Sequence, residues 1–165
     1  MNKFLLDNLE FTVDLDQLFR VIRMDQADDD ADTVIKMAEE AQSIARPKAL
    51  YKVAYVEEKG DNFVVIDGEK FISRVMSVNL KDVHRVFPFV ATCGTELEEW
   101  SSSIDDMLES YWADAIKIQA MNCALKALET HLEEHFKPGK TACMNPGSLE
   151  DWPISEQEKL FRVLG

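Results

Sequence analysis

Apolar residues recur at every seventh position in the second half of the chain. The series is Ile104, Tyr111, Ile118, Leu125 and Leu132, with Met107, Leu108, Ala115, Met121 and Leu128 beside it. Such a repeat predicts one apolar stripe along a long helix. Ser103 followed by Asp106 forms a capping box that would begin this helix, and residues 137–139, Lys-Pro-Gly, would end it. We therefore expect a helix over residues 104–136, about 50 Å long, along which other elements pack.

Capping signals before an apolar face predict three shorter helices. They begin at Asp14 with Gln17, at Thr33, and at Ser155 with Glu158. The second helix would end at Ala45, because Pro47 follows. The acidic run at residues 28–32 lacks the glycine and the terminal glutamate of a calcium loop. We interpret it as a solvated run that caps the second helix.

In the middle of the chain, β-forming residues alternate with turn signals. Three runs predict strands: residues 50–56, 63–66 and 69–75. Asp67 and Gly68 join the last two as a strong hairpin signal. A short helical connection is expected over residues 79–85 and a further strand over residues 87–92, where Pro88 favours a sheet edge. This order predicts an α+β fold in which an antiparallel sheet of at least three strands packs on the long helix.

The composition fits one folded domain with an acidic surface. The 165 residues are 46% hydrophobic and 9% aromatic, which is enough for one core, so we expect a single domain over residues 1–165. The net charge of -13 argues against nucleic acid or an anionic membrane as a partner, because both would be repelled. No apolar run approaches the ~20 residues of a membrane span, and the N-terminus lacks the features of a signal peptide. A cytoplasmic protein is expected.

One cysteine lies at a predicted junction of strand, glycine and helix. Cys93 precedes Gly94 and Thr95, and Thr95 with Glu98 forms a capping box for a short helix. Backbone N–H groups at such a junction stabilise a thiolate or a bound anion. The alternative is a small, half-buried thiol at a tight turn. The odd number of cysteines and the absence of a C-x-x-C pattern predict reduced thiols.

Two histidines stand four residues apart near the end of the predicted long helix. His131 and His135 fit the pattern H-x-x-E-H, which is typical of inverted zinc-hydrolase motifs and places two imidazoles on one helical face. The rest of the chain offers Glu150, Glu156 and Glu158 as a third ligand. The alternative is that both are helix-terminal residues that interact favourably with the helix dipole. A metal-dependent hydrolase built on these histidines is therefore the second functional hypothesis.

Three stretches of the chain together resemble one known family. They are RVFPFVATCGTELEEW, YWADAIKIQAMNCALKALETHLEEHF and MNPGSLEDWPISEQEKLF. In order and wording they resemble the activation domain of cobalamin (vitamin B12)-dependent methionine synthase, especially its stand-alone relatives, over residues 51–164. The resemblance implies a twisted antiparallel sheet against a long helix. It also implies a domain that binds S-adenosylmethionine beside the corrinoid-carrying module, where reductive methylation rescues an inactive cob(II)alamin.

The resemblance places the ligand loop of the family at residues 143–148. The family motif is Arg-x-x-x-Gly-Tyr, and the matching residues are Cys143, Met144, Asn145, Pro146, Gly147 and Ser148. Cys143 replaces the arginine that would hold the carboxylate of S-adenosylmethionine. Ser148 replaces the tyrosine. Of this motif, only the glycine at Gly147 is kept.

Further candidate residues come from the same resemblance. They are Asp151 and Trp152 as the support of the loop, Cys93, Gly94 and Thr95 as the turn that faces it, and Lys126 and Lys140 as substitutes for the lost arginine. Lys126 corresponds to an acidic residue in the family's long helix. Either lysine would hold a carboxylate only as a point charge, without bidentate geometry. Trp152 with Pro153 has an alternative role as a plug of the core beneath the last helix.

These observations imply an accessory or reactivation-type module of a corrinoid-dependent methyl-transfer system. Its expected partner is a corrinoid protein or a cobalamin-dependent methyltransferase, and cobalamin would come only through that partner. The degenerate loop is expected to bind S-adenosylmethionine weakly or not at all. We expect no turnover by the chain alone. Relatives continue past the last helix into further sheet-forming sequence, so the chain is expected to be shortened at its C-terminus.

Overall fold

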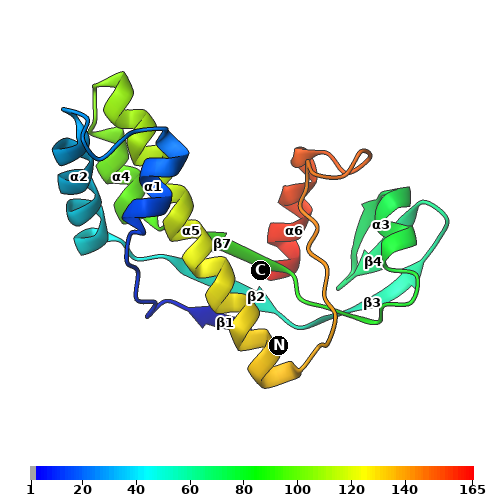
Figure 1. Cartoon of the computed structure of the whole chain (residues 1–165). Helices are drawn as coiled ribbons and strands as arrows, with labels where there is room; N and C mark the ends of the chain where they lie inside the picture. The colour runs from blue at the N-terminus through cyan, green and yellow to red at the C-terminus, as the bar shows by residue number, and fades with distance from the viewer. Residues whose placement is uncertain (1–2) are drawn as a thin grey trace. The chain divides into compact units, whose positions relative to one another are not determined.

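Segments that are far apart in the sequence fold together in each of two units (Figure 1). The computed structural model describes residues 3–165. The helical unit comprises Leu5–Ala49 and Ala91–Lys137, and the sheet unit comprises residues 3–4, Leu50–Val90 and Pro138–Gly165. The single domain expected over residues 1–165 stays a prediction.

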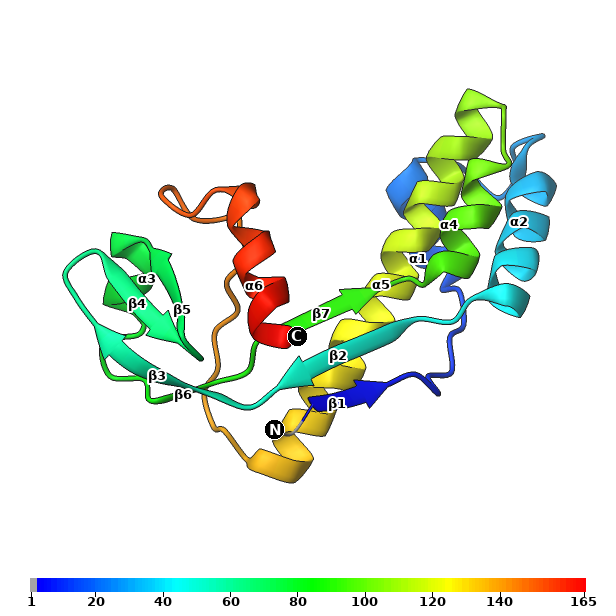
Figure 2. The same ribbon diagram turned by 180° about the vertical axis from the view of Figure 1, so that it is seen from behind.

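The helical unit is organised around the long helix. Its helices are α1 (Leu15–Ile22), α2 (Ala31–Ile44), α4 (Thr95–Ser102) and α5 (Met107–Phe136). Helices α1, α2 and α4 all contact α5, and Figure 2 shows the same helices from behind. Leu18, Val34, Leu97 and Ile116, all 0% exposed, belong to the core that these helices share. The predicted long helix is therefore confirmed.

Helix α5 begins three residues later than predicted. Its N-cap is Asp106, whose carboxylate accepts hydrogen bonds of 2.9 Å from the N–H groups of Leu108 and of the residue after it. Ser103 instead donates its hydroxyl to the carbonyl of Trp100 at the end of α4, so the capping box at Ser103 is wrong. The predicted end is confirmed, because Lys137 has a left-handed conformation with a φ of 43°.

The buried face of α5 differs from the predicted stripe. Tyr111 and Ile118 belong to the seven-residue series, yet they are 51% and 54% exposed, and Leu125 is half-buried. The buried face includes a row at a four-residue spacing: Trp112, Ile116, Ala120, Ala124 and Leu128. Small side chains in this row allow neighbouring helices to approach the axis of α5 closely. The core therefore forms on this row.

Helices α1 and α2 agree with the prediction, but the acidic run has a different role. Asp14 caps α1 by accepting a hydrogen bond of 2.9 Å from the N–H of Gln17. Asp30, at the N-cap of α2, has a φ of -87° and a ψ of -4°, unlike the extended conformation of a residue that caps with its side chain. The carboxylates of Asp25 and Asp28 accept hydrogen bonds from backbone N–H groups of the loop before α2. The carboxylates of this region therefore fix the loop rather than cap the helix.

The sheet unit contains an antiparallel sheet with the strand order β5-β4-β3-β6. Its strands are β3 (Ala54–Lys59), β4 (Phe63–Ile66), β5 (Glu69–Ile72) and β6 (Arg85–Val86). Asp67 and Gly68 form the turn between β4 and β5, with φ values of 55° and 80° that fit a type I′ turn. Val64, Phe71 and Trp152 lie in the core of this unit. The antiparallel sheet and its hairpin are therefore confirmed.

Three predicted strands are longer than the observed ones, and one of them, over residues 87–92, is observed as β7 (Phe89–Thr92). The run at residues 50–56 is divided between β2 (Lys48–Lys52) and β3. Strand β5 ends at Ile72 because Ser73 caps α3 (Arg74–Asn79), where its hydroxyl accepts a hydrogen bond of 2.9 Å from the N–H of Met76. The helical connection expected over residues 79–85 is therefore wrong, because the observed helix α3 already ends at Asn79.

The remaining elements are three strands within which the chain passes between the units, and a last turn and helix. Strands β1 (Lys3–Leu6), β2 and β7 (Phe89–Thr92) pair in the order β1-β2-β7, and the chain passes from one unit to the other within them. Helix α6 (Gln157–Leu164) follows the 3-10 turn η1 (Ile154–Glu156). Ser155 lies inside that turn, so its predicted capping box is wrong.

The structure confirms an α+β fold with antiparallel sheet pairing and a long helix. The packing of a twisted sheet on that helix, and the likeness to the activation-domain fold, stay predictions. Within residues 3–165, no helix is both long and apolar enough to cross a membrane.

Candidate functional site

The loop at residues 143–148 is a turn closed by its own serine, Ser148. Ser148 accepts a hydrogen bond of 3.1 Å at its Oγ from the N–H of Asn145 and donates the same hydroxyl to the Asn145 carbonyl at 2.6 Å. The N–H of Ser148 also donates to that carbonyl, at 3.0 Å. Cys143, Asn145, Gly147 and Ser148 are exposed, and Met144 and Pro146 are half-buried. The loop therefore keeps its shape through short-range bonds while much of it remains open to solvent.

Gly147 is the one residue of this loop whose backbone requires glycine. Its φ is 89°, and its N–H donates a hydrogen bond of 2.6 Å to the carbonyl of Trp152. A Cβ at this position would meet its nearest neighbour, the Cβ of Ile154, at 3.5 Å, which is ordinary contact. The constraint is therefore the left-handed backbone rather than a lack of space.

Asp151 supports the loop by binding the start of α3. Its carboxylate accepts hydrogen bonds from the hydroxyl of Ser73 at 2.5 Å and from the N–H of Arg74 at 2.6 Å. The hydrogen bond from Ser73, followed by those from backbone N–H groups, lowers the pKa of Asp151 below its ordinary value. Sequence reasoning missed Ser73, which lies 78 residues before Asp151 and shares no local pattern with it.

Trp152 anchors the same loop in the core of the sheet unit. It is 4% exposed and meets the ring of Phe71 edge-on, with 6.0 Å between centroids. Val163 of α6 belongs to the same core. Within the part of the chain that the structure describes, the buried Nε1 of Trp152 has no hydrogen-bond partner. Trp152 therefore supports the loop from beneath, as a residue of the core.

The bonds of Asp151 predict a pH-dependent contribution to stability. Because its pKa is lowered on folding, Asp151 stabilises the folded state above the unfolded value near 3.8, and this contribution is lost as the pH falls through the lower folded pKa. Asp151→Asn should therefore lower the thermal unfolding midpoint at pH 7, and the difference from the unchanged protein should shrink as the pH falls below the unfolded value of 3.8. Glu150→Gln, at an exposed neighbour, is the control. A difference that does not shrink as the pH falls would contradict the assignment.

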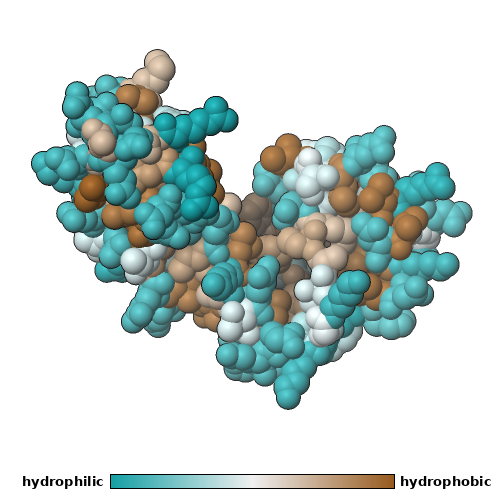
Figure 3. All heavy atoms as spheres, in the orientation of Figure 1, coloured by the Kyte–Doolittle hydropathy of each residue, from teal (hydrophilic) through white to brown (hydrophobic). Residues whose placement is uncertain are grey.

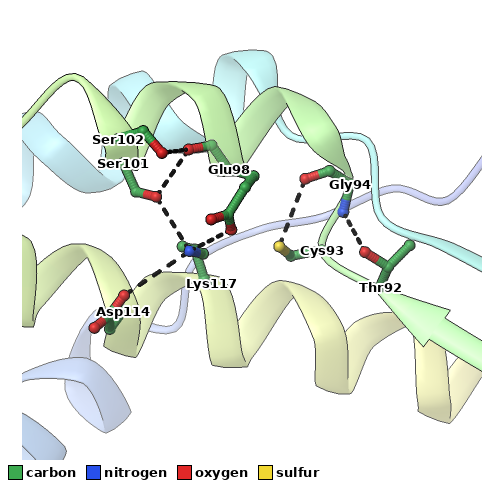
Figure 4. A network of polar contacts seen from close by, with 8 residues as sticks. All are labelled: Thr92, Cys93, Gly94, Glu98, Ser101, Ser102, Asp114 and Lys117. Carbon is green, nitrogen blue, oxygen red and sulfur yellow. Dashed lines mark hydrogen bonds and ion pairs between the residues drawn. The ribbon is translucent and has the colours of Figure 1, made fainter. Parts of the chain in front are cut away.

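A second cluster of candidate residues lies at the start of α4 in the helical unit (Figure 4). Gly94 is the N-cap of α4 with a φ of 94°, and a Cβ there would lie 2.6 Å from the carbonyl oxygen of Arg46. Its N–H donates a hydrogen bond of 3.1 Å to Thr92 Oγ1. Thr95 is the first residue inside the helix, so the predicted capping box of Thr95 and Glu98 is wrong. Glycine takes the cap position because the chain turns there in the left-handed region.

Cys93 is a half-buried thiol at this turn. Its Sγ lies 3.6 Å from the carbonyl oxygen of Gly94, to which it donates. Burial raises the pKa of Cys93, while Lys117 acts in the opposite direction and Glu98 adds to the rise. The net shift is upward, so the thiol is protonated near neutral pH. The geometry therefore supports the interpretation of a small thiol at a tight turn rather than that of a stabilised thiolate.

Lys117 ties the two helices beside Cys93 together (Figure 4). Its ammonium lies 2.5 Å from Glu98 Oε2, 3.9 Å from Asp114 Oδ1 and 3.1 Å from Ser101 Oγ. Burial by itself lowers the pKa of Lys117, but the hydrogen bond and charge of Glu98, together with Cys93 and Asp114, outweigh it, and the net pKa is raised. Lys117 was not among the predicted site residues, because Glu98 and Ser101 lie on another helix, α4.

The predicted residue Lys126 lies elsewhere on the helical unit. It lines a groove of ≈ 540 Å³ together with Leu6, Leu9, Cys123, Ala127, Thr130, His131 and Glu134. Cys93 lines another groove, of ≈ 410 Å³, and the loop at residues 143–148 belongs to the sheet unit. The structure therefore brings the loop together with Asp151 and Trp152, and Cys93 together with Gly94 and Thr95. It places Lys126 in neither group.

His131 and His135, the histidines of the hydrolase hypothesis, stack their rings on each other. The rings of His131 and His135 lie 4.0 Å apart with an interplanar angle of 24°, and His135 Nδ1 lies 2.9 Å from the carbonyl oxygen of His131. Burial, followed by the charge of His135, lowers the pKa of His131. Among residues 3–165 there is no group of three or more metal-ligating side chains that would hold an ion. The hydrolase hypothesis thus gains no third ligand from the described residues.

Comparison with models of known protein families and with curated proteins found no match for this chain.

Proposed function

We propose that the chain is an accessory, reactivation-type module of a corrinoid-dependent methyl-transfer system. It docks to a corrinoid protein or a cobalamin-dependent methyltransferase, which carries the cobalamin. It binds S-adenosylmethionine weakly or not at all and does not turn over substrate alone. Support comes from the three stretches that resemble the methionine synthase activation domain and from an α+β fold with an antiparallel sheet and a 30-residue helix.

The observation that carries the proposal is the conformation of Gly147. It is the one residue kept from the family's Arg-x-x-x-Gly-Tyr motif, and it stands where a φ of 89° requires glycine. A loop that keeps the turn glycine while it replaces both ligand-binding side chains is what we expect of a retained scaffold with a degenerate site. The exposed Cys143 and Ser148 stand at the replaced positions.

Neither replacement supplies the chemistry of the original side chain. Cys143 offers no planar pair of N–H donors for a carboxylate, which the guanidinium of arginine has. The hydroxyl of Ser148 is engaged within its own turn. Loss of a charge-assisted hydrogen bond costs about 1.5 to 3 kcal/mol, or roughly one to two decades in affinity. Weak or absent binding of S-adenosylmethionine follows.

Restoring the two family residues should restore binding. The unchanged protein is expected to show no binding of S-adenosylmethionine in the low micromolar range, whereas Cys143→Arg with Ser148→Tyr should bind it about ten- to a hundredfold more tightly. Titration calorimetry on the full chain measures both. Ala142→Arg with Ser148→Tyr is the matched control, because it places the same charge one exposed position away. Low micromolar binding by the unchanged protein would refute the degenerate site.

Docking is tested separately from ligand binding. A purified corrinoid protein from the source organism, loaded with cob(II)alamin, is titrated with the full chain in sedimentation velocity runs. We expect a complex that forms at micromolar concentrations, as is common for transient accessory contacts. The same protein with its corrinoid removed, and a soluble protein of similar size and charge, are the controls. If no corrinoid protein of the organism forms a complex at about 100 µM, the proposal fails even where the loop prediction holds.

A further inference from the structure

An apolar strip lies exposed on α5 of the helical unit. We call it the α5 strip, and its residues are Met107, Leu108, Tyr111, Ile118 and Met121, which are between 36% and 88% exposed. Four of them, at positions 107, 111, 118 and 121, follow helical spacing over about 21 Å of helix. In the view of Figure 3, hydrophobic residues, in brown, lie among hydrophilic ones, in teal, over this unit. Exposed apolar residues that gather on one face with a polar rim mark interaction sites.

The spacing of the α5 strip fits another helix. Tyr111 and Ile118 stand seven residues apart, as the a positions of a heptad. Met107 and Met121 fall on d positions of the same repeat, and the d position between them is the exposed Asp114. Such a seam packs by placing knobs of one helix into holes of the other. The row that contains Trp112 and Ile116 already packs within the unit. The strip therefore gives α5 a second apolar face, with the spacing at which helices pack.

A groove at one end of the strip provides room for an anchoring side chain. Ile118 and Met121 are two of its walls, and its volume is ≈ 410 Å³. The other lining residues are Ala91, Thr92, Cys93, Asp114 and Lys117. An apolar anchor that enters a groove from an amphipathic helix is a common mode of peptide recognition. Methionine walls adapt readily to such an anchor.

The charge of the helical unit indicates the kind of helix. This unit contains 21 Asp and Glu against 8 Lys and Arg, a net charge of -13, whereas the sheet unit contains 10 against 10. At the groove, the side chains of Glu98 and Asp114 are 63% and 71% exposed and share the single ammonium of Lys117. One negative charge therefore remains uncompensated there. A cationic partner is favoured, and a second copy of the chain, with its own -13, is disfavoured.

We propose that the α5 strip docks a basic amphipathic helix of another protein. The apolar face of that helix packs on Tyr111 and Ile118, and one apolar side chain enters the groove beside Met121. Lysine or arginine residues of that helix pair with Glu98 and with Asp114, which lies at a d position of the strip. The inference does not rest on the corrinoid proposal, because it uses none of the residues of the loop at 143–148.

The test uses a synthetic helical peptide as the probe. An 18-residue fluorescent peptide carries leucine at its a and d positions and lysine or arginine at most others. A scrambled peptide of the same composition has its leucines dispersed around the helix. Fluorescence anisotropy with the full chain should show saturable binding of the first peptide, weakening as salt rises, and about tenfold weaker binding of the scrambled one.

Variants of the protein locate the binding site. Ile118→Ser with Met121→Ser should weaken binding of the peptide about tenfold or more, because both residues are removed from the apolar contact. Glu98→Gln with Asp114→Asn should weaken it about two- to fivefold and flatten its salt dependence. Val21→Ser changes a residue of α1 that is 53% exposed and should leave binding unchanged.

Three results would overturn the proposal. The first is equal binding of the ordered and scrambled peptides, or no binding of the ordered peptide at about 1 mM. The second is unchanged affinity in the Ile118→Ser, Met121→Ser protein. The third is a dimer of the free chain in sedimentation equilibrium that Ile118→Ser dissociates, since a second copy would then be the occupant of the strip.

Discussion

Ile116→Ala should lower the free energy of unfolding by about 2 to 5 kcal/mol, whereas Ile118→Ala should change it by less than about 0.5 kcal/mol. The two isoleucines stand two positions apart on α5. Ile116 is 0% exposed and lies in the core of the helical unit, and Ile118 is 54% exposed. The substitution deletes the same atoms and changes helix propensity equally at both positions. The difference between the two variants therefore measures burial alone.

Urea denaturation followed by circular dichroism gives both values. The midpoint should shift to lower urea for Ile116→Ala with little change in slope, because the surface exposed on unfolding is almost the same. Equal losses in the two variants would mean that the seven-residue series faces the core after all. A larger loss for Ile118→Ala would require a different rotation of α5 about its axis.

Asp67→Asn should cost about 3 to 5 kcal/mol of stability, the amount typical of leaving a buried charge without its partner. Lys52 is 4% exposed, and its ammonium pairs with the Asp67 carboxylate and donates to the Val163 carbonyl at 3.1 Å. The substitution removes the charge and keeps the turn, because asparagine also adopts the left-handed conformation that Asp67 has before Gly68.

A double-mutant cycle separates the ion pair from the turn. Lys52→Met removes the buried charge, so Lys52→Met with Asp67→Asn should recover much of the stability that Asp67→Asn alone loses. Asp61→Asn, in the exposed turn before β4, is the control and should stay within about 0.5 kcal/mol. Additive losses in the cycle, or a cost below 0.5 kcal/mol for Asp67→Asn, would show that the pair does not persist in solution.

Some elements follow from contacts between residues close together in the chain, and these were predictable. Asp14 caps α1 through a residue three positions away, Asp67 and Gly68 turn the hairpin by themselves, and Lys137 ends α5. Each of these features depends on a side chain or a backbone conformation within a few residues of the helix end or the hairpin turn. The sequence alone therefore determined the α+β class, the long helix and the hairpin.

The candidate site was predictable only in part. The resemblance led to residues 143–148, where Gly147 has the backbone that its position requires. The hydrogen bond from Ser73 to Asp151 joins residues 78 positions apart in the sequence, and no periodic pattern indicates such a contact, so it was not predictable. For Cys93, the turn was correctly located, but the burial that raises its pKa depends on packing around the turn.

Only the tertiary structure decided which face of α5 forms the core. The sequence contains two apolar rows on this helix, one through Tyr111 and Ile118 at a spacing of seven and one through Trp112 and Ile116 at a spacing of four. Periodicity shows that both rows exist, and the hydrophobic effect favours the burial of either. The choice depends on the helices that approach, and α1, α2 and α4 pack where alanines let them come close. Tyr111 and Ile118 were left at the surface, and Leu125 is half-buried, because close approach, rather than periodicity, determines burial.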